Sequence, residues 1–364
     1  MTTILGSVPD PKHRPPVLGD VAREAGVSVP TVSRVLTGST PVSPAKREAV
    51  HRAIERLGYR PNAAARALVS GRRSMIAVLA GRTSDRGSAG TIQGIVDVAR
   101  GADFNVVITV VEDDQPSHVK AAVDLALSQP VAGAIVLEFD RPGIAALKAL
   151  PASLPVVVAG ATPTTPRDVP VASLNARQAA FEATQYLLSL GHPTVHHIGR
   201  PASSGPAGRS LGWREAVVSA GLEPYAYLQD RDDPAAGFEA AAALLRDHPD
   251  MTALFCANDD LAFGAMRRLQ DAGRRIPQDI SVLGFEGTAP GEFWNPALST
   301  VLLDFEIIGR GAARLLFDLL DTGTCQMTDT ATPELLIRAS TGPPPGPRAT
   351  PGTYPASPDL AAPS

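Results

Sequence analysis

The sequence of 364 residues predicts a multidomain protein with a small all-α head and a larger, two-lobed α/β body built on doubly wound parallel sheets. Two patterns predict this fold class. Residues 18–68 carry three short helical patterns and then a brief fourth segment that starts after a proline. From residue 75 onward, short apolar runs with few charges alternate with amphipathic helical stretches, as expected for parallel strands buried on both faces.

The first two helical patterns of the head lie in the stretch LGDVAREAGVSVPTVSRVL. Gly26 is placed to make the turn between them, and Ser28 is a suitable N-cap for the second helix. In this second helix Val32, Val35 and Leu36 recur at the spacing of one buried face. Its outward-facing residues are Val29, Pro30, Thr31, Ser33 and Arg34. A tight turn, a small buried face and a polar outer face are typical of a helix-turn-helix.

A third helix is expected in AKREAVHRAIERLGY, where Ser43 and Pro44 mark its start. The three patterns alone would also fit any small three-helix unit, because helix-turn-helix predictions from pattern include false positives. The charge distribution favours contact with nucleic acid. Residues 1–73 hold 12 Lys and Arg against 5 Asp and Glu, a net charge of +7, whereas the rest of the chain carries −11. A basic head on an acidic body would confine phosphate contacts to the head.

The apolar runs of the body are the expected strands, and they lie at residues 75–80, 105–111, 133–139, 155–161, 194–199, 253–257 and 280–285. Two sets of strand–helix units predict two lobes, with a ligand crevice at the carboxyl ends of the strands. We expect residues 1–16 to form a flexible arm. The Pro-rich residues 342–364 lack apolar periodicity, so we expect them to be disordered.

The run VAREAGVSVPTVSRVL, continued by GYRPNAAARAL, resembles the DNA-binding head and hinge of the LacI/GalR (lac repressor/galactose repressor) family. Stretches such as YLLSLGHPTVHHIGRP and ALFCANDDLAFGAMRRLQDAG resemble the effector-binding core of that family, which is similar to periplasmic sugar-binding proteins. The resemblance implies a helix-turn-helix DNA-binding domain at 17–61, a hinge at 62–73 and a periplasmic-binding-protein-like, effector-binding and dimerisation body at 74–341. It divides this body into a first lobe at about 74–173 and 302–326 and a second lobe at about 174–301 and 327–341.

By this resemblance, Val29 and Pro30 occupy the first turn of the recognition helix, where family members contact base edges. Their apolar side chains offer only van der Waals contact, for instance with a thymine methyl group. We therefore expect Arg34 to hydrogen-bond a guanine; contact with phosphate alone is the alternative. The other DNA-contacting residues expected in the head are Leu18, Thr31 and Ser33, the last two being suited to phosphates.

In the hinge, the resemblance implies DNA contacts by Asn62, Ala65 and Leu68. Leu68 would insert into the minor groove at the centre of the operator and kink the duplex. The helical segment expected within this hinge has about seven residues, too few for a helix that is stable alone. Its alanines leave no other bulky side chain to act as the wedge. The alternative is that Leu68 packs on the body.

For the effector, the resemblance implies contacts by Arg209, which in the family binds sugar hydroxyls or a carboxylate, and by the pair Asn258 and Asp259. Glu286 stands where many family members have Asp after a strand, and it completes this set.

Departures from the family pattern bear on the kind of effector. Gly160 and Leu303 stand where polar residues are frequent in the family, so we expect a pocket that is less polar than a typical hexose site. Arg82 and Asp85, in the first strand-to-helix loop, either add polar contacts to the ligand or form a surface salt bridge with each other.

The sequence indicates no catalytic or metal chemistry. His196 and His197 are adjacent on an expected strand, so they would point to opposite faces and cannot chelate one metal. The two cysteines have no disulfide or metal-ligand spacing. We therefore expect no metal, no cofactor and no enzyme activity. No apolar run approaches the roughly 20 residues that cross a bilayer, and no signal-peptide pattern is seen, so we expect a cytoplasmic protein without a membrane partner.

These observations predict a sequence-specific, ligand-responsive transcriptional regulator, most simply a repressor of genes for the catabolism of a sugar or another small molecule. Its expected partners are double-stranded DNA with a pseudo-palindromic operator, a small-molecule effector such as a sugar, and a second copy in a homodimer. The alternatives are a corepressor-dependent regulator, a periplasmic-type small-molecule binding protein and a doubly wound enzyme. The missing signal peptide and the basic head argue against a periplasmic-type binding protein. The missing phosphate loop or catalytic constellation argues against a doubly wound enzyme.

Overall fold

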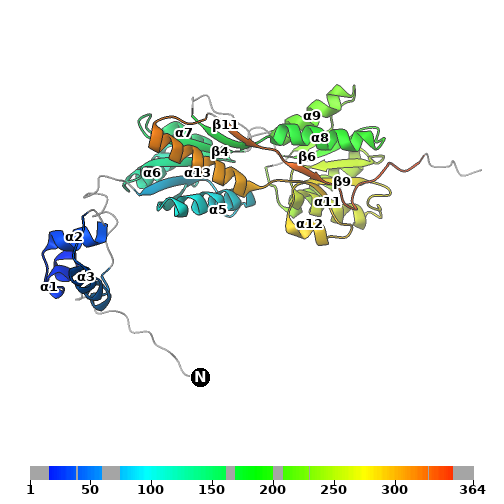
Figure 1. Ribbon diagram of the computed structural model, residues 1–364. Helices are drawn as coiled ribbons and strands as arrows, with labels where there is room; N and C mark the ends of the chain where they lie inside the picture. The colour runs from blue at the N-terminus through cyan, green and yellow to red at the C-terminus, as the bar shows by residue number, and fades with distance from the viewer. Residues whose placement is uncertain are drawn as a thin grey trace, which may run out of the picture. The chain divides into compact units, whose positions relative to one another are not determined.

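The computed structural model describes residues 16–37, 40–59, 74–160, 169–199, 208–228, 230–326 and 328–346 (Figure 1). The chain divides into two compact units, a head of residues Met1–Ser74 and a body of residues Met75–Ser364.

The described part of the head contains the helices α1 (Leu18–Glu24), α2 (Val29–Thr37) and α3 (Pro44–Leu57). Their apolar faces enclose a small core around Val21, Val32 and Val50, whose side chains have no exposed surface. Gly26 makes the turn between α1 and α2 with a φ of +64°, a left-handed conformation that glycine adopts without a steric penalty. The predicted helix-turn-helix is therefore confirmed.

The first lobe of the body contains a six-stranded sheet in the order β11-β5-β4-β3-β1-β2, with parallel pairing throughout. Helices α5 and α13 cover one face of this sheet, and α6 and α7 cover the other. The strands are β1 (Met75–Ala80), β2 (Asn105–Val110), β3 (Gly133–Glu138), β4 (Val156–Gly160), β5 (Val171–Leu174) and β11 (Thr328–Ala331). The helices are α5 (Arg86–Gly101), α6 (Pro116–Leu127), α7 (Arg141–Ala149) and α13 (Phe305–Thr322).

The second lobe repeats this plan with a sheet in the order β12-β10-β9-β8-β6-β7, in which β12 alone is antiparallel to its neighbour. Helices α8 and α9 pack on one face, and α10 and α11 pack on the other. The strands are β6 (His196–Gly199), β7 (Ala226–Leu228), β8 (Ala253–Cys256), β9 (Ser281–Glu286), β10 (Ser299–Leu302) and β12 (Glu334–Leu336). The helices are α8 (Ala176–Ser189), α9 (Gly208–Ser219), α10 (Pro234–Asp247), α11 (Asp259–Asp271) and α12 (Ala289–Phe293).

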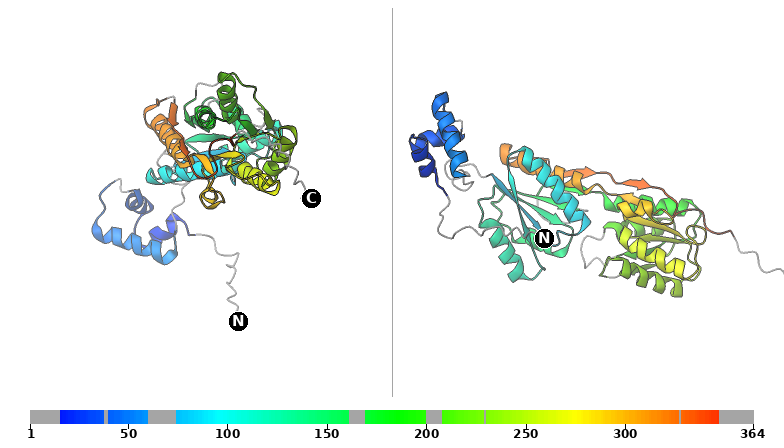
Figure 2. Two further views of the ribbon diagram at one scale, coloured as in Figure 1. Left: turned by 90° about the vertical axis from the view of Figure 1, so that its right-hand side faces the viewer. Right: turned by 90° about the horizontal axis from the view of Figure 1, so that it is seen from below.

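The chain passes between the lobes three times: between β5 and α8, between β10 and α13, and between β11 and β12 (Figure 2). The last passage corrects a boundary. Residues 327–341 were expected in the second lobe, but β11 pairs with β5 of the first, so the chain crosses only after Ala331. The strand TDTA has no apolar run, so its sequence pattern carries no sign of the sheet it joins.

Residues 342–346 correct the expectation of disorder from residue 342 onward. The carbonyl of Gly342 accepts hydrogen bonds from Nε2 of the buried His192 and from the hydroxyl of Ser281, both at 2.9 Å. The amide of Gly342 donates to the Ser281 hydroxyl at 3.0 Å. This segment is therefore fastened to the second lobe. Residues 347–364, and residues 1–15 of the arm expected at residues 1–16, lie outside the described residues.

His196 and His197 point to opposite faces of the sheet that contains β6, as predicted. The ring of His197 stacks between Trp213 and Phe255, with centroid distances of 4.9 and 5.1 Å. Its Nδ1 donates to the Phe255 carbonyl and its Nε2 shares a hydrogen bond with the Ser210 hydroxyl, each at 2.9 Å; in the neutral imidazole Nε2 is the acceptor. Burial lowers the pKa of His197 to about 4.

We expect the body to lose stability as the pH falls from about 7 toward 4. The folded-state pKa of His197, about 4, lies below the ordinary value of 6.5, so the unfolded state binds the proton first. The stability that this histidine contributes is complete above about pH 7 and is smaller by roughly 2 kcal/mol at pH 5. Urea unfolding at both pH values should show a smaller pH effect in His197→Gln, whose amide does not titrate. An equal effect in both proteins would exclude His197 as its source.

Candidate functional site

Helix α2 carries most of the residues that were predicted to contact DNA. Val29, Pro30 and Arg34 are exposed on its surface, and Val29 is 43% exposed. The half-buried members of the predicted set are Leu18, Thr31 and Ser33. Leu18 packs against the core of the head, so much of its surface serves the fold. Asn62, Ala65 and Leu68 lie outside the described residues.

The cations of the head differ in whether an acidic side chain pairs with them. Three arginines of the head form ion pairs with acidic side chains, in the pairs Arg23–Asp20, Arg52–Glu48 and Arg56–Glu24. Within the described residues of the head, no acidic partner pairs with Arg34, Lys46 or Arg47. The charge of Arg34 on the outer face of α2 is thus available to a base edge or a phosphate.

A cavity of about 460 Å³ opens in the body where the carboxyl ends of strands from both lobes meet the N-termini of several helices. Its charged lining residues are Arg82, Asp85, Arg86, Arg209, Asp232, Asp233, Asp260 and Glu286. Its other lining residues include Ser84, Ser88, Ser210, Asn258, Phe139 and Phe305.

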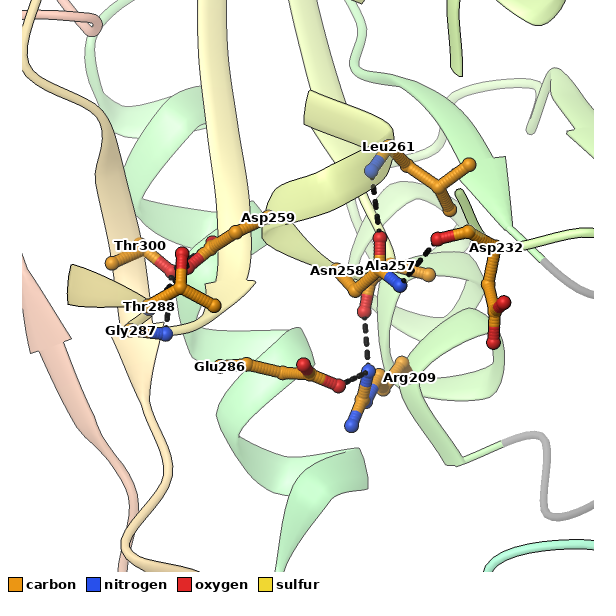
Figure 3. A network of polar contacts seen from close by, with 10 residues as sticks. All are labelled: Arg209, Asp232, Ala257, Asn258, Asp259, Leu261, Glu286, Gly287, Thr288 and Thr300. Carbon is orange, nitrogen blue, oxygen red and sulfur yellow. Dashed lines mark hydrogen bonds and ion pairs between the residues drawn. The ribbon is translucent and has the colours of Figure 1, made fainter. Parts of the chain in front are cut away.

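Arg209 and Glu286 lie side by side in this cavity (Figure 3). Nη1 of Arg209 donates to a carboxylate oxygen of Glu286 at 2.9 Å and to the carbonyl of Ala257 at 2.6 Å. The guanidinium also lies 4.7 Å from the centre of the Phe285 ring. Burial raises the pKa of Glu286, and the positive charge of Arg209 opposes that shift. The pair is therefore a desolvated donor–acceptor unit in which each partner stabilises the charge of the other.

Glu286 has a φ of +111°, far from the conformations that non-glycine residues prefer. Such a residue costs roughly 1–3 kcal/mol and persists only where its surroundings hold it in place. Gly287 follows with a φ of +67°, so the two residues form a turn at the end of β9.

Asn258 and Asp259, predicted as neighbours in the effector site, have different surroundings. Asn258 lines the cavity and caps helix α11, with its Oδ1 accepting from the Leu261 amide at 2.8 Å and its Nδ2 donating to the Asp232 carbonyl at 2.9 Å. Asp259 is fully buried and does not line the cavity. Its carboxylate accepts hydrogen bonds from Thr288 and Thr300 instead (Figure 3).

Arg82 and Asp85 pair with each other at 3.0 Å and also line the cavity. The ion pair between them is therefore present, and their contact with a ligand stays a prediction. Their neighbour Arg86, which was not predicted, reaches across the cavity. Its Nη2 donates to the carbonyl of Gly287 in the second lobe at 3.2 Å. Arg86 thus makes a direct polar contact between the lobes.

The expectation of a weakly polar pocket is wrong. Gly160 and Leu303, on which it rested, do not line the cavity, and Leu303 is only 2% exposed within the core. Charged side chains of both signs line it instead. The family pattern showed only that positions 160 and 303 lack a polar side chain. Residues at other positions make the cavity polar.

Sequence reasoning missed several lining residues, chiefly Arg86, Phe139, Asp232, Asp233, Asp260 and Phe305. Phe139 follows directly after β3, so the rule that ligands lie at the carboxyl ends of parallel strands could have found it. Asp260 is next to the predicted pair, and burial together with the charges of neighbouring carboxylates raises its pKa. Asp233 precedes Pro234 and caps α10, with its carboxylate accepting from the Ala236 amide at 2.8 Å, so its sequence pattern indicates a helix start and not a ligand contact.

Within the residues that the structure describes, no helix has both the length and the apolar character to cross a membrane. The same residues include no group of three or more His, Cys, Asp or Glu side chains arranged to hold a metal ion.

Residues 17–62 match the model of the bacterial regulatory proteins of the lacI family, and residues 184–341 match that of a periplasmic binding protein-like domain. Catabolite control protein A of Priestia megaterium is 32% identical over 311 residues, which are 84% of this chain and 92% of that protein. The structure of the lac repressor dimer bound to operator and the anti-inducer ONPF matches with a TM-score of 0.83 at 28% identity, over 90% of this chain and 100% of that chain. The complex of the transcriptional regulator CelR with cellobiose matches with a TM-score of 0.64 at 30% identity, over 89% of this chain and 99% of that chain.

The similarity extends over the helix-turn-helix head and the two-lobed body in one continuous chain, so it covers the whole architecture rather than one shared domain. The chain is therefore a member of the lacI family of bacterial regulatory proteins, a DNA-binding transcriptional regulator.

Proposed function

We propose that this regulator is a homodimeric repressor whose affinity for a pseudo-palindromic operator changes when a sugar or similar polyhydroxylated molecule occupies the cavity. The observation that carries this proposal is the Arg209–Glu286 pair, held among aromatic and polar side chains in a cavity lined by both lobes. The complex of a related regulator with cellobiose supports a sugar as the ligand class.

The cavity offers the contacts that a sugar ring requires. Arg209 can donate two hydrogen bonds to vicinal hydroxyl groups, and Glu286 can accept from a hydroxyl group. Phe139 and Phe305 meet edge to face with ring centroids 5.9 Å apart and present apolar surface to the C–H face of the ring. Asn258 of the second lobe also lines the cavity, with its side-chain amide held by the Leu261 amide and the Asp232 carbonyl.

A ligand that touches both lobes stabilises their closed arrangement, and this differential contact couples the cavity to DNA binding. Arg82, Asp85 and Arg86 contribute from the first lobe, and Arg209 and Glu286 contribute from the second. Whether the ligand releases or strengthens operator binding depends on which arrangement suits the operator. Corepression is thus the second candidate, and a ligand titration separates it from induction.

The outer strands of both sheets expose apolar side chains that a second copy could cover. Ile108 and Val110 on β2 are 45% and 48% exposed, and β2 is the last strand of its sheet. On β7, the corresponding strand of the second lobe, Tyr227 and Leu228 are also exposed. Two exposed apolar strand edges in one body favour pairing between copies, because unpaired edges of this kind promote association.

The same proposal places the protein in the cytoplasm, where an operator is accessible, and assigns it no enzymatic reaction. A periplasmic-type binding protein would have no use for the helix-turn-helix, so that alternative is disfavoured.

Selection from random duplexes should return a pseudo-palindrome of roughly 14–20 base pairs whose affinity falls steeply with salt. Val29 and Pro30 offer only apolar contacts, so Arg34 should determine a guanine in each half-site. Arg34→Ala should relax the preference at that base by about 1–3 kcal/mol. Arg52→Ala, whose arginine pairs with Glu48, is the control. Equal weakening of all sequences by Arg34→Ala would reduce Arg34 to a phosphate contact, and a selected site without symmetry would contradict the proposal.

Leu68→Ala should weaken specific operator binding by a few kcal/mol. This is roughly the free energy gained when an inserted side chain bends the DNA and lets it contact more protein surface. Binding to non-specific DNA should change little. Gel-shift titrations and circular-permutation gels measure affinity and bend, with Val69→Ala as the neighbouring control. An unchanged bend in Leu68→Ala would show that Leu68 is not the wedge.

Arg209→Ala should still bind operator but respond poorly to effector. Loss of a charged hydrogen-bond donor from a desolvated site costs about 2 kcal/mol or more, roughly a 30-fold shift in the effector midpoint. A thermal-shift screen of sugars, polyols and nucleosides, starting with cellobiose, supplies the effector for titrating operator release. Arg177→Ala, which removes an exposed ion pair with Glu215, should leave the midpoint unchanged. An unchanged midpoint in Arg209→Ala would shift the site toward Asn258 and Glu286.

A further inference from the structure

We infer that Asp259 is a positioning residue that holds the Glu286–Gly287 turn, and that this turn links the proposed effector cavity to the opposite lobe. The inference rests on the proposed assignment of the cavity and concerns how its key carboxylate is held in place. Asp259 would thus affect effector response without touching the effector.

The carboxylate of Asp259 satisfies three donors around the turn. Its Oδ2 accepts from the amide of Thr288 at 2.6 Å and from the hydroxyl of Thr288 at 2.9 Å. Its Oδ1 accepts from the hydroxyl of Thr300 at 2.6 Å, and that hydroxyl accepts from the amide of Gly287 at 3.2 Å. One buried carboxylate therefore holds the backbone of both residues that follow Glu286. It accepts directly from the Thr288 amide and is linked to the Gly287 amide through the Thr300 hydroxyl.

The backbone packs closely around this carboxylate and around the turn. A Cβ atom on Gly284 would lie 2.3 Å from Oδ1 of Asp259, so a glycine is required beside it. A Cβ atom on Gly287 would lie 2.6 Å from a methyl carbon of Leu302, and the φ of +67° independently favours glycine. Both glycines thus fit a turn that packs closely against Asp259 and β10.

The turn faces two partners that belong to different parts of the body. Its first residue, Glu286, pairs with Arg209 in the cavity. The carbonyl of its second residue, Gly287, accepts the hydrogen bond from Arg86 on α5 of the first lobe. The φ of +111° at Glu286 is a strained backbone conformation between these two contacts, so the surroundings must hold it in place. If Asp259 released the turn, both contacts would lose their geometry together.

Hydrogen–deuterium exchange of the ligand-free, full-length protein tests this role. In Asp259→Ala, peptides covering residues 286–292 should exchange at least tenfold faster. Without the carboxylate, the turn has fewer hydrogen bonds to break, so its local opening costs less free energy. Asp259→Asn should show a smaller increase, since one amide oxygen still accepts. Thr300→Val, which removes only the bridging hydroxyl, keeps the test possible if the alanine variant fails to fold. It should also accelerate exchange of residues 286–292, but by less than Asp259→Ala, because both hydrogen bonds from Thr288 to Asp259 remain. Peptides at the start of α5, residues 84–90, should also exchange faster in these variants.

The matched control is Asp279→Ala, which removes a carboxylate of the same lobe that accepts from the Arg275 amide at 2.8 Å, away from the turn. It should leave residues 286–292 unchanged. Unchanged exchange of the turn in all Asp259 and Thr300 variants would overturn the inference, and so would uniform acceleration of the whole second lobe, which indicates a general structural role. Acceleration of the turn without residues 84–90 would overturn the link to the first lobe. Because no effector is used, failure to find a sugar that binds would count against the proposed function and not against Asp259.

Discussion

Burial of both faces of two parallel sheets is the constraint on which the rest of the body depends. Strands that are covered by helices on each side carry mostly apolar side chains, as β3 does in its buried residues 134–137, before Glu138 at its carboxyl end. Polar groups are therefore concentrated where the strands end and the helices begin. The two sheets bring these ends together, because the chain crosses between the lobes three times. The cavity is a direct consequence of that topology.

The cavity balances many charges in a small, partly desolvated volume. Its lining contains five carboxylates and three arginines, and the N-termini of surrounding helices add partial positive charge. Raised pKa values at Asp260 and Glu286 show that burial and mutual repulsion remain significant there. A polyhydroxylated ligand suits such a site, since hydroxyl groups can donate to carboxylates and accept from guanidinium groups without adding charge.

The interactions that matter in the head differ from those in the body. Its core is small, and a net charge of +7 over residues 1–73 supplies sequence-independent attraction to DNA. We expect discrimination between base sequences to depend on a few side chains of α2. Because Val29 and Pro30 present only apolar surface, we expect hydrogen-bonded base recognition on that helix to fall chiefly to Arg34. The acidic body contributes no such attraction, so ligand response and DNA affinity are separated along the chain.

The sequence by itself determined the helix-turn-helix, the two-lobed α/β body, most strands and the family, because apolar periodicity and motif spacing are local properties of the chain. It also pointed to Arg209 and Glu286, which the structure places in contact although 77 residues separate them. Only the tertiary structure decided that Asp259 turns away from the cavity, that Arg86 bridges the lobes and that β11 joins the first sheet. These outcomes depend on which distant segments meet. A buried carboxylate and one that lines a cavity have the same sequence signature, and only the packing around Thr288 and Thr300 distinguishes them.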